Sequence, residues 1–372
     1  MSWWKKLWCK KEHPVEKGPI PRPAETGPPA APLSSGRPLA PTEGAVTVAP
    51  PCKTESPIAS FPREDRWVDF DTLAKIKDQA DEESILRRIG SIFPGASADE
   101  VLFRYYLSRA IYFKEYSLPT LPASAHRILA LSHNINSSLV DYLEVIEVDP
   151  GLAKAVFRLA NSPAYAAASE CTTLAQAVAH IGLQEVERIS MSQAMGNRVF
   201  HIRHYESLVK SLTKHLIAAA VGSQEIASHQ NGPASEAFLA GLFHDTGKLV
   251  ILNLIADVQR KRKHAVPAGL IESAFDAFHV AVGENACRTW GLPDNLIAAV
   301  SQHHVFPIPD DPLTRSVVLG NRIAHLIESE KPSPEPEKDD PFQALLNFGP
   351  EEVARLVSKT KGILEEFSTA VS

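Results

Sequence analysis

Hydrophobic residues recur every three or four positions along most of the chain from residue 118 onward. Pro and Gly fall between these periodic segments, and no segment shows the alternation of apolar and polar residues that marks a half-buried strand. A period of three to four residues places the apolar side chains on one face of a helix. The pattern therefore predicts an all-α domain whose helices pack through their apolar faces.

The same helical period continues on both sides of this central region. Residues 65–117 predict two or three amphipathic helices, with Ser97 and Asp99 as candidate caps, and we interpret them as a packing extension of the main domain. Residues 328–342 are rich in Glu, Asp, Pro and Lys, which is typical of a solvated loop. Residues 343–372 predict one terminal helix that covers the bundle.

The first 64 residues lack any helical period. They begin with a short Trp/Lys head, made of Trp3, Trp4, Lys5, Lys6, Trp8, Lys10 and Lys11. The rest is dense in Pro, Ala, Gly, Ser and Thr, and so few large apolar side chains cannot offset the entropy of ordering, which predicts a disordered Pro-rich arm. Indole rings and lysines suit the membrane interface, so the head suggests weak membrane contact, with a frayed terminus or a docking peptide as alternatives.

Composition narrows the class of protein. With 372 residues, 44% of them hydrophobic, the chain can bury a sizeable core, and its net charge of -6 argues against a general nucleic-acid surface. The cysteines show no CxxC spacing, which indicates neither a disulfide framework nor a cysteine zinc site. We find no apolar run of the roughly 20 residues that span a bilayer and no secretory signal, so we expect a cytoplasmic protein.

The most informative motif is a His-Asp pair at the end of an apolar helical segment. His244 and Asp245 follow the run that starts at Phe238, and Gly247 and Lys248 come shortly after them. Imidazole and carboxylate groups are common metal ligands, so we interpret the pair as metal-binding. Further candidate side chains lie on other helical segments, with spacings that suit one site fed by several helices: His215, His279, His303, His304 and Asn321.

Six short motifs in order resemble the HDOD family, the HD-related output domain of bacterial signalling proteins. They are Leu118–Pro122, Asp149–Ala153, Leu159–Ser162, Ala177–Gly182, Phe238–Asp245 and Trp290–Pro293. The resemblance covers residues 118–327 and implies two helical lobes, an N-terminal lobe over 118–205 and an HD-like lobe over 206–327. It also implies a regulatory role in which the domain binds a partner signalling protein or a small ligand.

The resemblance extends to the metal-binding residues of HD-type phosphohydrolases. It implies that His215 takes the place of their first histidine, that His244 and Asp245 form the doublet, and that the remaining histidines are accessory ligands: His279, His303 and His304. Such mixed ligands suit Fe, Mn, Zn or Ni better than calcium. If the protein were a hydrolase, Lys248 would be its catalytic candidate, since an ammonium group steadies phosphate charge.

At two places the sequence differs from the HD-type phosphohydrolases, and both differences favour a regulatory role over catalysis. Asn321 stands where the enzymes have a distal Asp, which removes a negative charge from a site otherwise supplied by one Asp and neutral imidazoles. No Gly-Tyr-Pro signature follows His304, so we do not expect cleavage of cyclic di-GMP. We therefore expect a module without catalysis. The alternative is a metal-dependent phosphohydrolase acting on a nucleotide or phosphomonoester, and a third reading is an adaptor localised by its Trp/Lys head.

Other polar features have ordinary structural explanations. Asp149 before Pro150 is typical of a helix start, and Asn161 of a helix end. The basic run Arg260–His264 suggests the solvated end of a helix that stops near Ala256 or Val258, with a phosphate or RNA contact as the alternative. We interpret the remaining histidines as surface or satisfied core residues: His126, His133, His180, His201, His204, His229, His264 and His325.

Overall fold

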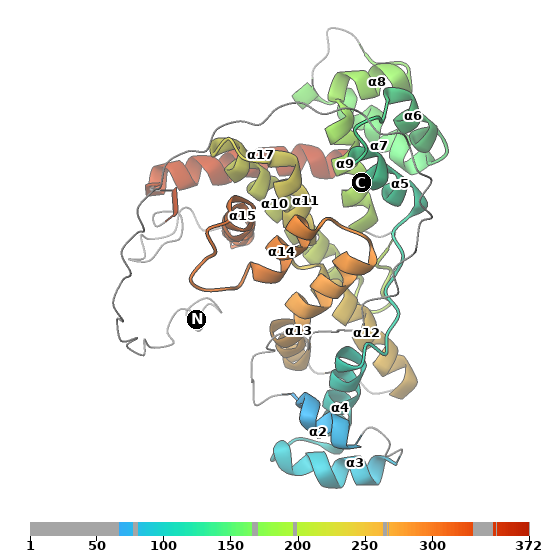
Figure 1. The fold of residues 1–372 in the computed structure, drawn as a ribbon, viewed down its shortest axis with the longest axis vertical. Helices are drawn as coiled ribbons and strands as arrows, with labels where there is room; N and C mark the ends of the chain where they lie inside the picture. The colour runs from blue at the N-terminus through green and yellow to red at the C-terminus, as the bar shows by residue number, and fades with distance from the viewer. Residues whose placement is uncertain are drawn as a thin grey trace, which may run out of the picture. The chain divides into compact units, whose positions relative to one another are not determined.

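The computed structural model describes residues 67–76, 81–165, 170–195, 199–262, 266, 268–329, 345, 346 and 348–371. Within these ranges all regular structure is helical and none of it is strand, which confirms the predicted all-α fold (Figure 1). The Pro-rich arm with its Trp/Lys head, His264, and all but the first two residues of the predicted acidic loop lie outside the described residues.

The helices before residue 118 form a small core of their own. They are α2 (Phe70–Ile76), α3 (Glu82–Ile89), the short 3-10 helix η1 (Gly90–Ile92) and α4 (Ala98–Tyr112). Their buried side chains pack together around Leu73, Ile85 and Tyr105. Ser97 caps α4 by accepting a hydrogen bond from the Glu100 N–H, as predicted, whereas Asp99 lies inside the first turn. The extension is thus a folded helical unit.

The next five helices, which we call the first lobe, have strong sequence signals at their starts. They are α5 (Ala123–Ser132), α6 (Leu139–Glu147), α7 (Pro150–Ala160), α8 (Leu174–Ile181) and α9 (Leu183–Gln193), with the 3-10 turn η2 (Pro163–Tyr165) after α7. Asp149 accepts hydrogen bonds from the first N–H groups of α7, and Pro150 occupies its first position. Asn161 ends α7, and its amide pairs with the backbone of Cys171. Both residues are structural, as the motif predicts.

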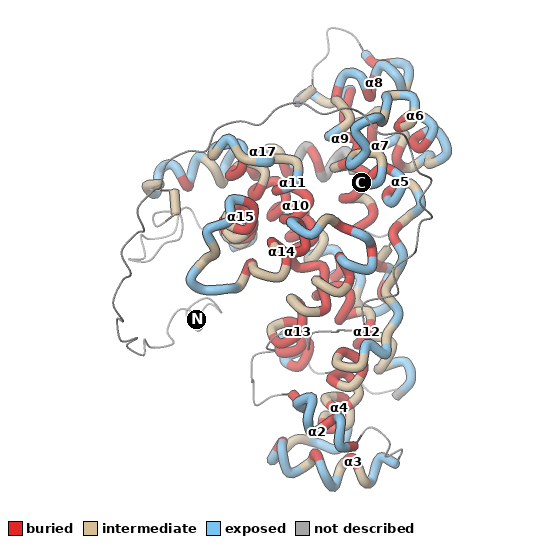
Figure 2. Tube along the Cα trace, in the orientation of Figure 1, coloured by how far each residue is buried: buried red, intermediate tan, exposed pale blue. Residues whose placement is uncertain are grey.

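The six helices from residue 206 to residue 328, which we call the second lobe, are arranged around the long helix α10. They are α10 (Glu206–His229), α11 (Ala234–Phe243), α12 (Thr246–Arg262), α13 (Ala268–Thr289), α14 (Asp294–Gln302) and α15 (Pro312–Glu328). Helix α10 packs against α11 and α15, α12 packs against α13, and α14 contacts α11, α13 and α15. Figure 2 shows that buried residues follow α10, α11 and α15 through the middle of this lobe. Helix α12 also contacts α4, which attaches the N-terminal extension.

Two expectations about α11 and α12 are corrected. Helix α12 continues to Arg262, about one turn beyond the predicted end, because the basic residues of its last turn favour the carbonyl end of the helix dipole. We expected no apolar run long enough to cross a membrane, but the stretch Ala234–Lys261 is long and apolar enough by length and composition. However, 89% of its most apolar segment is buried inside the protein. Its apolar side chains thus belong to the protein core.

Helix α17 (Pro350–Val371) contacts both lobes. It packs against α10 and α15 of the second lobe and against α7 and α9 of the first, and Figure 1 shows it running beside α10 toward α9. Phe367 lies edge-on to Phe238 with ring centroids 5.8 Å apart, and Lys359 forms an ion pair with Glu225 at 2.5 Å. A single helix near the C-terminus that covers the bundle is what the periodicity predicts.

Two glycines allow helices of the second lobe to approach closely. A Cβ atom on Gly247 of α12 would overlap the carbonyl oxygen of His279 on α13. A Cβ atom on Gly320 of α15 would overlap the backbone and hydroxyl of Ser223 on α10. A residue with a Cβ atom at either position would push the two helices apart. Glycine at these positions therefore sets the spacing between α12 and α13 and between α15 and α10.

Candidate metal centre

Buried polar side chains from four separate places in the second lobe meet at one point. His215 comes from α10, His244 and Asp245 from the break between α11 and α12, His279 from α13, and His303 from the end of α14. None of these five residues is more than 5% exposed. Since polar groups are rarely buried without partners, this grouping needs an explanation.

The Asp245 carboxylate lies at the centre of the group. Its Oδ2 atom is 3.6 Å from Nε2 of His215 and 3.3 Å from Nε2 of His244. Its Oδ1 atom is 3.3 Å from Nε2 of His279 and 3.6 Å from Nε2 of His303. Each oxygen therefore faces two imidazoles.

The candidate ligand atoms fall into three sets, and two of them share Asp245. One of these two is His215, His244 and Asp245, and the other joins Asp245 to His279, His303 and the half-buried His304. The third set is His215, His325 and Glu328. Within each set the candidate ligand atoms lie no more than 4.8 Å from one another. The structure thus brings together six of the seven residues that the sequence suggested as metal ligands.

The histidine rings are held so that one nitrogen of each faces the carboxylate. Nδ1 of His244 lies 2.7 Å from the carbonyl oxygen of Gly241. Nδ1 of His279 lies 2.6 Å from the carbonyl oxygen of Phe275, and Nδ1 of His303 lies 2.6 Å from that of Val300. Because a carbonyl oxygen only accepts hydrogen bonds, Nδ1 carries the proton and Nε2 keeps its lone pair.

The Nε2 atoms of His215, His244, His279 and His303 have no hydrogen-bond partner among the described residues. A buried polar atom without a partner costs about 1–3 kcal/mol. Metal-binding histidines typically donate their other N–H to a carbonyl or carboxylate and direct the free nitrogen at the ion. The cluster fits a divalent transition metal in both respects.

Lys248 balances the charge of the central carboxylate. It lies in the first turn of α12, and its ammonium group pairs with Oδ2 of Asp245. The Lys248 side chain is 16% exposed, so it reaches from the solvent edge into the cluster. The residue proposed from sequence to steady phosphate therefore contacts a candidate metal ligand directly.

The pKa values of His244, His279 and Asp245 favour the forms that bind metals. Burial lowers the pKa of His244 to about 4 and that of His279 to about 3, although the Asp245 carboxylate opposes both shifts. Burial would raise the pKa of Asp245, but Lys248 and the surrounding imidazoles hold it well below its usual range. At neutral pH the imidazoles of His244 and His279 are therefore uncharged and the carboxylate is ionised, as metal ligands must be. His215 differs, because burial would lower its pKa but the Asp245 and Glu328 carboxylates raise it.

Helix α15 contributes residues that the sequence analysis did not assign to the site. Nδ1 of His215 lies 3.0 Å from Oε1 of Glu328, and Nδ1 of His325 lies 3.5 Å from Oε2 of the same carboxylate. The rings of His215 and His325 are 4.7 Å apart. The pairing of His325 with Glu328 agrees with its interpretation as a satisfied histidine. Glu328, which we assigned to the solvated loop, instead ends α15 and brings a second carboxylate next to His215.

Asn321 lies on the same helix. It is 7% exposed, and its Oδ1 atom has no hydrogen-bond partner among the described residues. His325 and Glu328 follow it at positions four and seven residues later, which places all three on one face of α15. This spacing is the signal in the sequence that could have identified Glu328.

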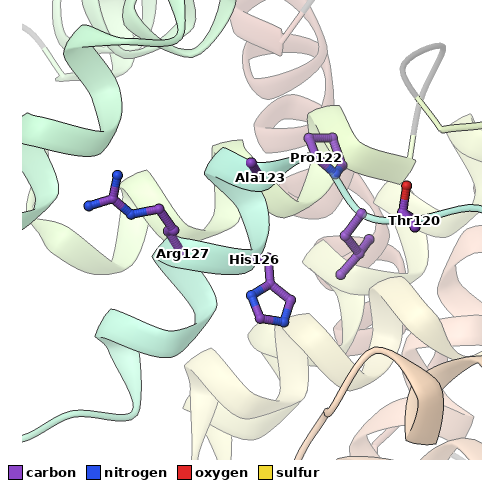
Figure 3. Close-up of a pocket in the computed structure, with 6 residues that line it drawn as sticks. Thr120, Pro122, Ala123, His126 and Arg127 are labelled. Atoms are coloured by element: carbon purple, nitrogen blue, oxygen red, sulfur yellow. The ribbon is translucent and has the colours of Figure 1, made fainter.

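The remaining histidines of the described ranges lie away from the cluster. Six of them are exposed, as expected: His126, His133, His180, His201, His204 and His229. An open hollow of about 730 Å³ on the first lobe is lined by residues 120–123, His126 and Arg127 (Figure 3). His126 and Arg127 leave α5 in different directions, so the polar groups of this hollow do not converge on one point.

Solved structures of similar fold come from several bacteria. The "Putative metal-dependent phosphohydrolase" of Shewanella amazonensis SB2B superimposes with a TM-score of 0.57 at 17% identity, over 73% of this chain and 98% of that one. The "Putative signal transduction protein" of Marinobacter aquaeolei VT8 has a TM-score of 0.50 at 21% identity, over 80% of this chain and 67% of that one. At these identities the likeness shows the fold alone.

Sequence comparison gives a more specific result. An uncharacterised protein of Treponema pallidum (strain Nichols) is 23% identical over 228 residues, which are 58% of this chain and 44% of that protein, so the match spans less than half of the relative. The HDOD domain model matches residues 118–306, about half of the chain and all six motifs of the sequence analysis. The chain therefore belongs to the HDOD family.

Proposed function

We propose that this protein is a signalling HDOD module whose second lobe holds a divalent transition-metal ion, and that the metal-loaded lobe binds a partner protein or a small ligand. One observation carries the proposal. Four buried imidazoles present Nε2 to the Asp245 carboxylate, and those nitrogens have no hydrogen-bond partner among the described residues. A metal ion would satisfy them, and Fe, Mn, Zn and Ni suit this donor set.

The arrangement of Asp245 and of three histidine rings supports the proposal. The carboxylate is ionised and shared between two ligand sets, and backbone carbonyls fix three of the rings. A cation that binds at Asp245 competes with the Lys248 ammonium, so metal loading frees this amine for an anionic group. When bound, the ion would supply a Lewis acid and lower the pKa of a coordinated water.

Metal analysis tests the proposal. We expect stoichiometric transition metal in protein purified without chelators and its loss in His244→Ala. The matched control is His229→Ala, which changes an exposed histidine on α10 and should leave the metal content unchanged. Absence of metal from the unaltered protein, or equal metal in the His244→Ala variant, would overturn the proposal.

The second candidate function is a metal-dependent phosphohydrolase acting on a nucleotide or a phosphomonoester. It is favoured by the position of Lys248 beside Asp245 and by Glu328, whose carboxylate offsets part of the charge that Asn321 lacks. Turnover of a panel of nucleotides and phosphomonoesters by metal-loaded protein separates the two functions. Activity that disappears in Asp245→Ala would establish the enzyme, and its absence throughout the panel would favour the regulatory module.

Partner and compartment follow from the same proposal. We place the protein in the reducing cytoplasm, which suits the free and buried thiols of Cys171 and Cys287. A signalling partner should be captured by residues 65–372 as well as by the whole chain, whereas an adaptor that acts through its Trp/Lys head would lose its partner with residues 1–64. Capture that depends on these first residues would therefore favour the adaptor.

A further inference from the structure

The four histidines that face Asp245 through Nε2 differ in the group that accepts a hydrogen bond from Nδ1. In His244, His279 and His303 the acceptor is a backbone carbonyl three or four residues earlier in the chain. In His215 it is the Glu328 carboxylate, 3.0 Å from Nδ1 and on a different helix. His215 is therefore the one of these four rings whose Nδ1–H donates to a negatively charged group.

The position of Glu328 in its helix would, without other contacts, disfavour the negative charge of its carboxylate. Glu328 is the last residue of α15, where the exposed carbonyl groups of a helix disfavour a negative charge. Its side chain is only 36% exposed, although an acid at a helix end can usually turn fully into water. Two imidazoles, His215 and His325, face its two oxygens and offset this local cost.

The second imidazole fixes the direction of the carboxylate. His325 lies one turn before Glu328 on α15, with Nδ1 3.5 Å from Oε2, and its ring packs against that of His215. With one oxygen near His325, the other is directed at His215. An anionic acceptor on Nδ1 makes the opposite nitrogen of an imidazole a stronger metal ligand and fixes the ring.

Helix α15 thus carries a charged acid two turns after the position where the amide of Asn321 stands. Lys248 neutralises Asp245, so Glu328 is the second carboxylate available to the cluster. It lies on the far side of the His215 ring, because the same ring turns Nε2 toward Asp245.

We propose that Glu328 is a positioning residue of the metal centre, which orients His215 and supplies through its ring the negative charge that Asn321 does not provide. His325 holds the carboxylate in place. This inference rests on the proposed function, since it requires that the cluster binds a metal ion.

Titration of the metal-free full chain with Co²⁺, followed by its visible absorption band, tests the role. Glu328→Gln keeps an oxygen acceptor without charge and should raise the Kd about 10-fold, and Glu328→Ala should raise it up to about 100-fold. The number of ions bound should not change, because Glu328 acts through His215. Glu284→Gln is the matched control, since Glu284 is 34% exposed and pairs with a surface arginine, and it should bind Co²⁺ as the unaltered protein does.

A second measurement needs no metal. Long-range ¹H–¹⁵N spectra of the imidazole rings, recorded at a pH where His215 is uncharged, should show its proton on Nδ1 in the metal-free protein and the redistribution of that proton in Glu328→Ala. A variant that unfolds is recognised by circular dichroism, and Glu328→Gln, which keeps the shape of the side chain, then carries the test.

The outcomes separate this inference from the proposed function. Tight Co²⁺ binding that is unchanged in both Glu328 variants overturns the positioning role and leaves the metal proposal intact. Loss of one whole equivalent of Co²⁺ also overturns it, because Glu328 would then be a ligand itself. Failure of the unaltered protein to bind Co²⁺, Zn²⁺ or Mn²⁺ removes the metal proposal and the positioning role together.

Discussion

Replacement of Asp245 by Asn gives the sharpest test of the metal centre. Asn keeps the shape of the side chain but removes the one charge to which both ligand sets connect. Its amide nitrogen can donate to one of the imidazole nitrogens that lie 3.3–3.6 Å from the carboxylate oxygens. We therefore expect the metal-free variant to fold and to lose its response to metal.

The size of that response can be estimated. A metal that binds only the folded state stabilises it by about 2.7 kcal/mol when its free concentration is 100 times Kd. The entropy of unfolding is about 2.1 cal/mol/K per residue, so a folded region of roughly 300 residues should gain about 4 °C in Tm. We expect this gain in the unaltered protein and less than about 1 °C in Asp245→Asn.

Thermal unfolding with and without Zn²⁺ or Mn²⁺ measures both values. Asp257→Asn is the control, since Asp257 lies on α12, which begins directly after Asp245, is 40% exposed and pairs with Arg260, and this variant should retain the full gain. An equal gain in Asp245→Asn and in the unaltered protein would show that metal binds elsewhere, and the reasoning from the cluster would fail.

Three further predictions concern the packing, the pH dependence and the N-terminal head. Gly247→Ala should destabilise the protein by about 1–3 kcal/mol in urea unfolding and weaken metal binding, whereas Gly269→Ala, where the added methyl group meets open space, should do neither. Folding lowers the pKa of His244 to about 4 and that of His279 to about 3, so below about pH 6.5 the unfolded chain binds more protons than the folded protein. The metal-free protein should therefore lose stability as the pH falls from 6.5 toward 4. Equal urea midpoints at pH 7 and pH 5 would contradict this prediction. Deletion of residues 1–11 should release any membrane-associated fraction into the supernatant after cell lysis, and an unchanged distribution would remove the membrane contact.

The local signals in the sequence were sufficient for the fold and for the centre of the site. Helical periodicity, together with caps such as Asp149, predicts the helices, because each signal depends on neighbours within one or two turns. The His244–Asp245 doublet interrupts an apolar stretch, so its polar character stands out without any knowledge of the tertiary structure.

The outer part of the site could not be predicted in the same way. Glu328 begins an acidic segment, and an acid in such a segment is usually solvated. Its spacing from Asn321 and His325 places it on their helix face, but its contact with His215, on a helix about a hundred residues earlier, is visible only in the structure. The end of α12 was misplaced for a related reason. Basic residues there were read as leaving the helix, whereas they extend its last turn.

The contacts of α17 determine which fragments of this protein keep their apolar surfaces covered. Val353, Leu364 and Phe367 are 2%, 3% and 5% exposed, so a chain cut before Pro350 would present the apolar surfaces that they cover to water and would tend to associate with itself. A fragment that stops at residue 306, where the family match ends, would also lack α15 and with it Glu328. For biochemical work, the boundary of the family match is therefore a poor guide to the boundary of the working unit.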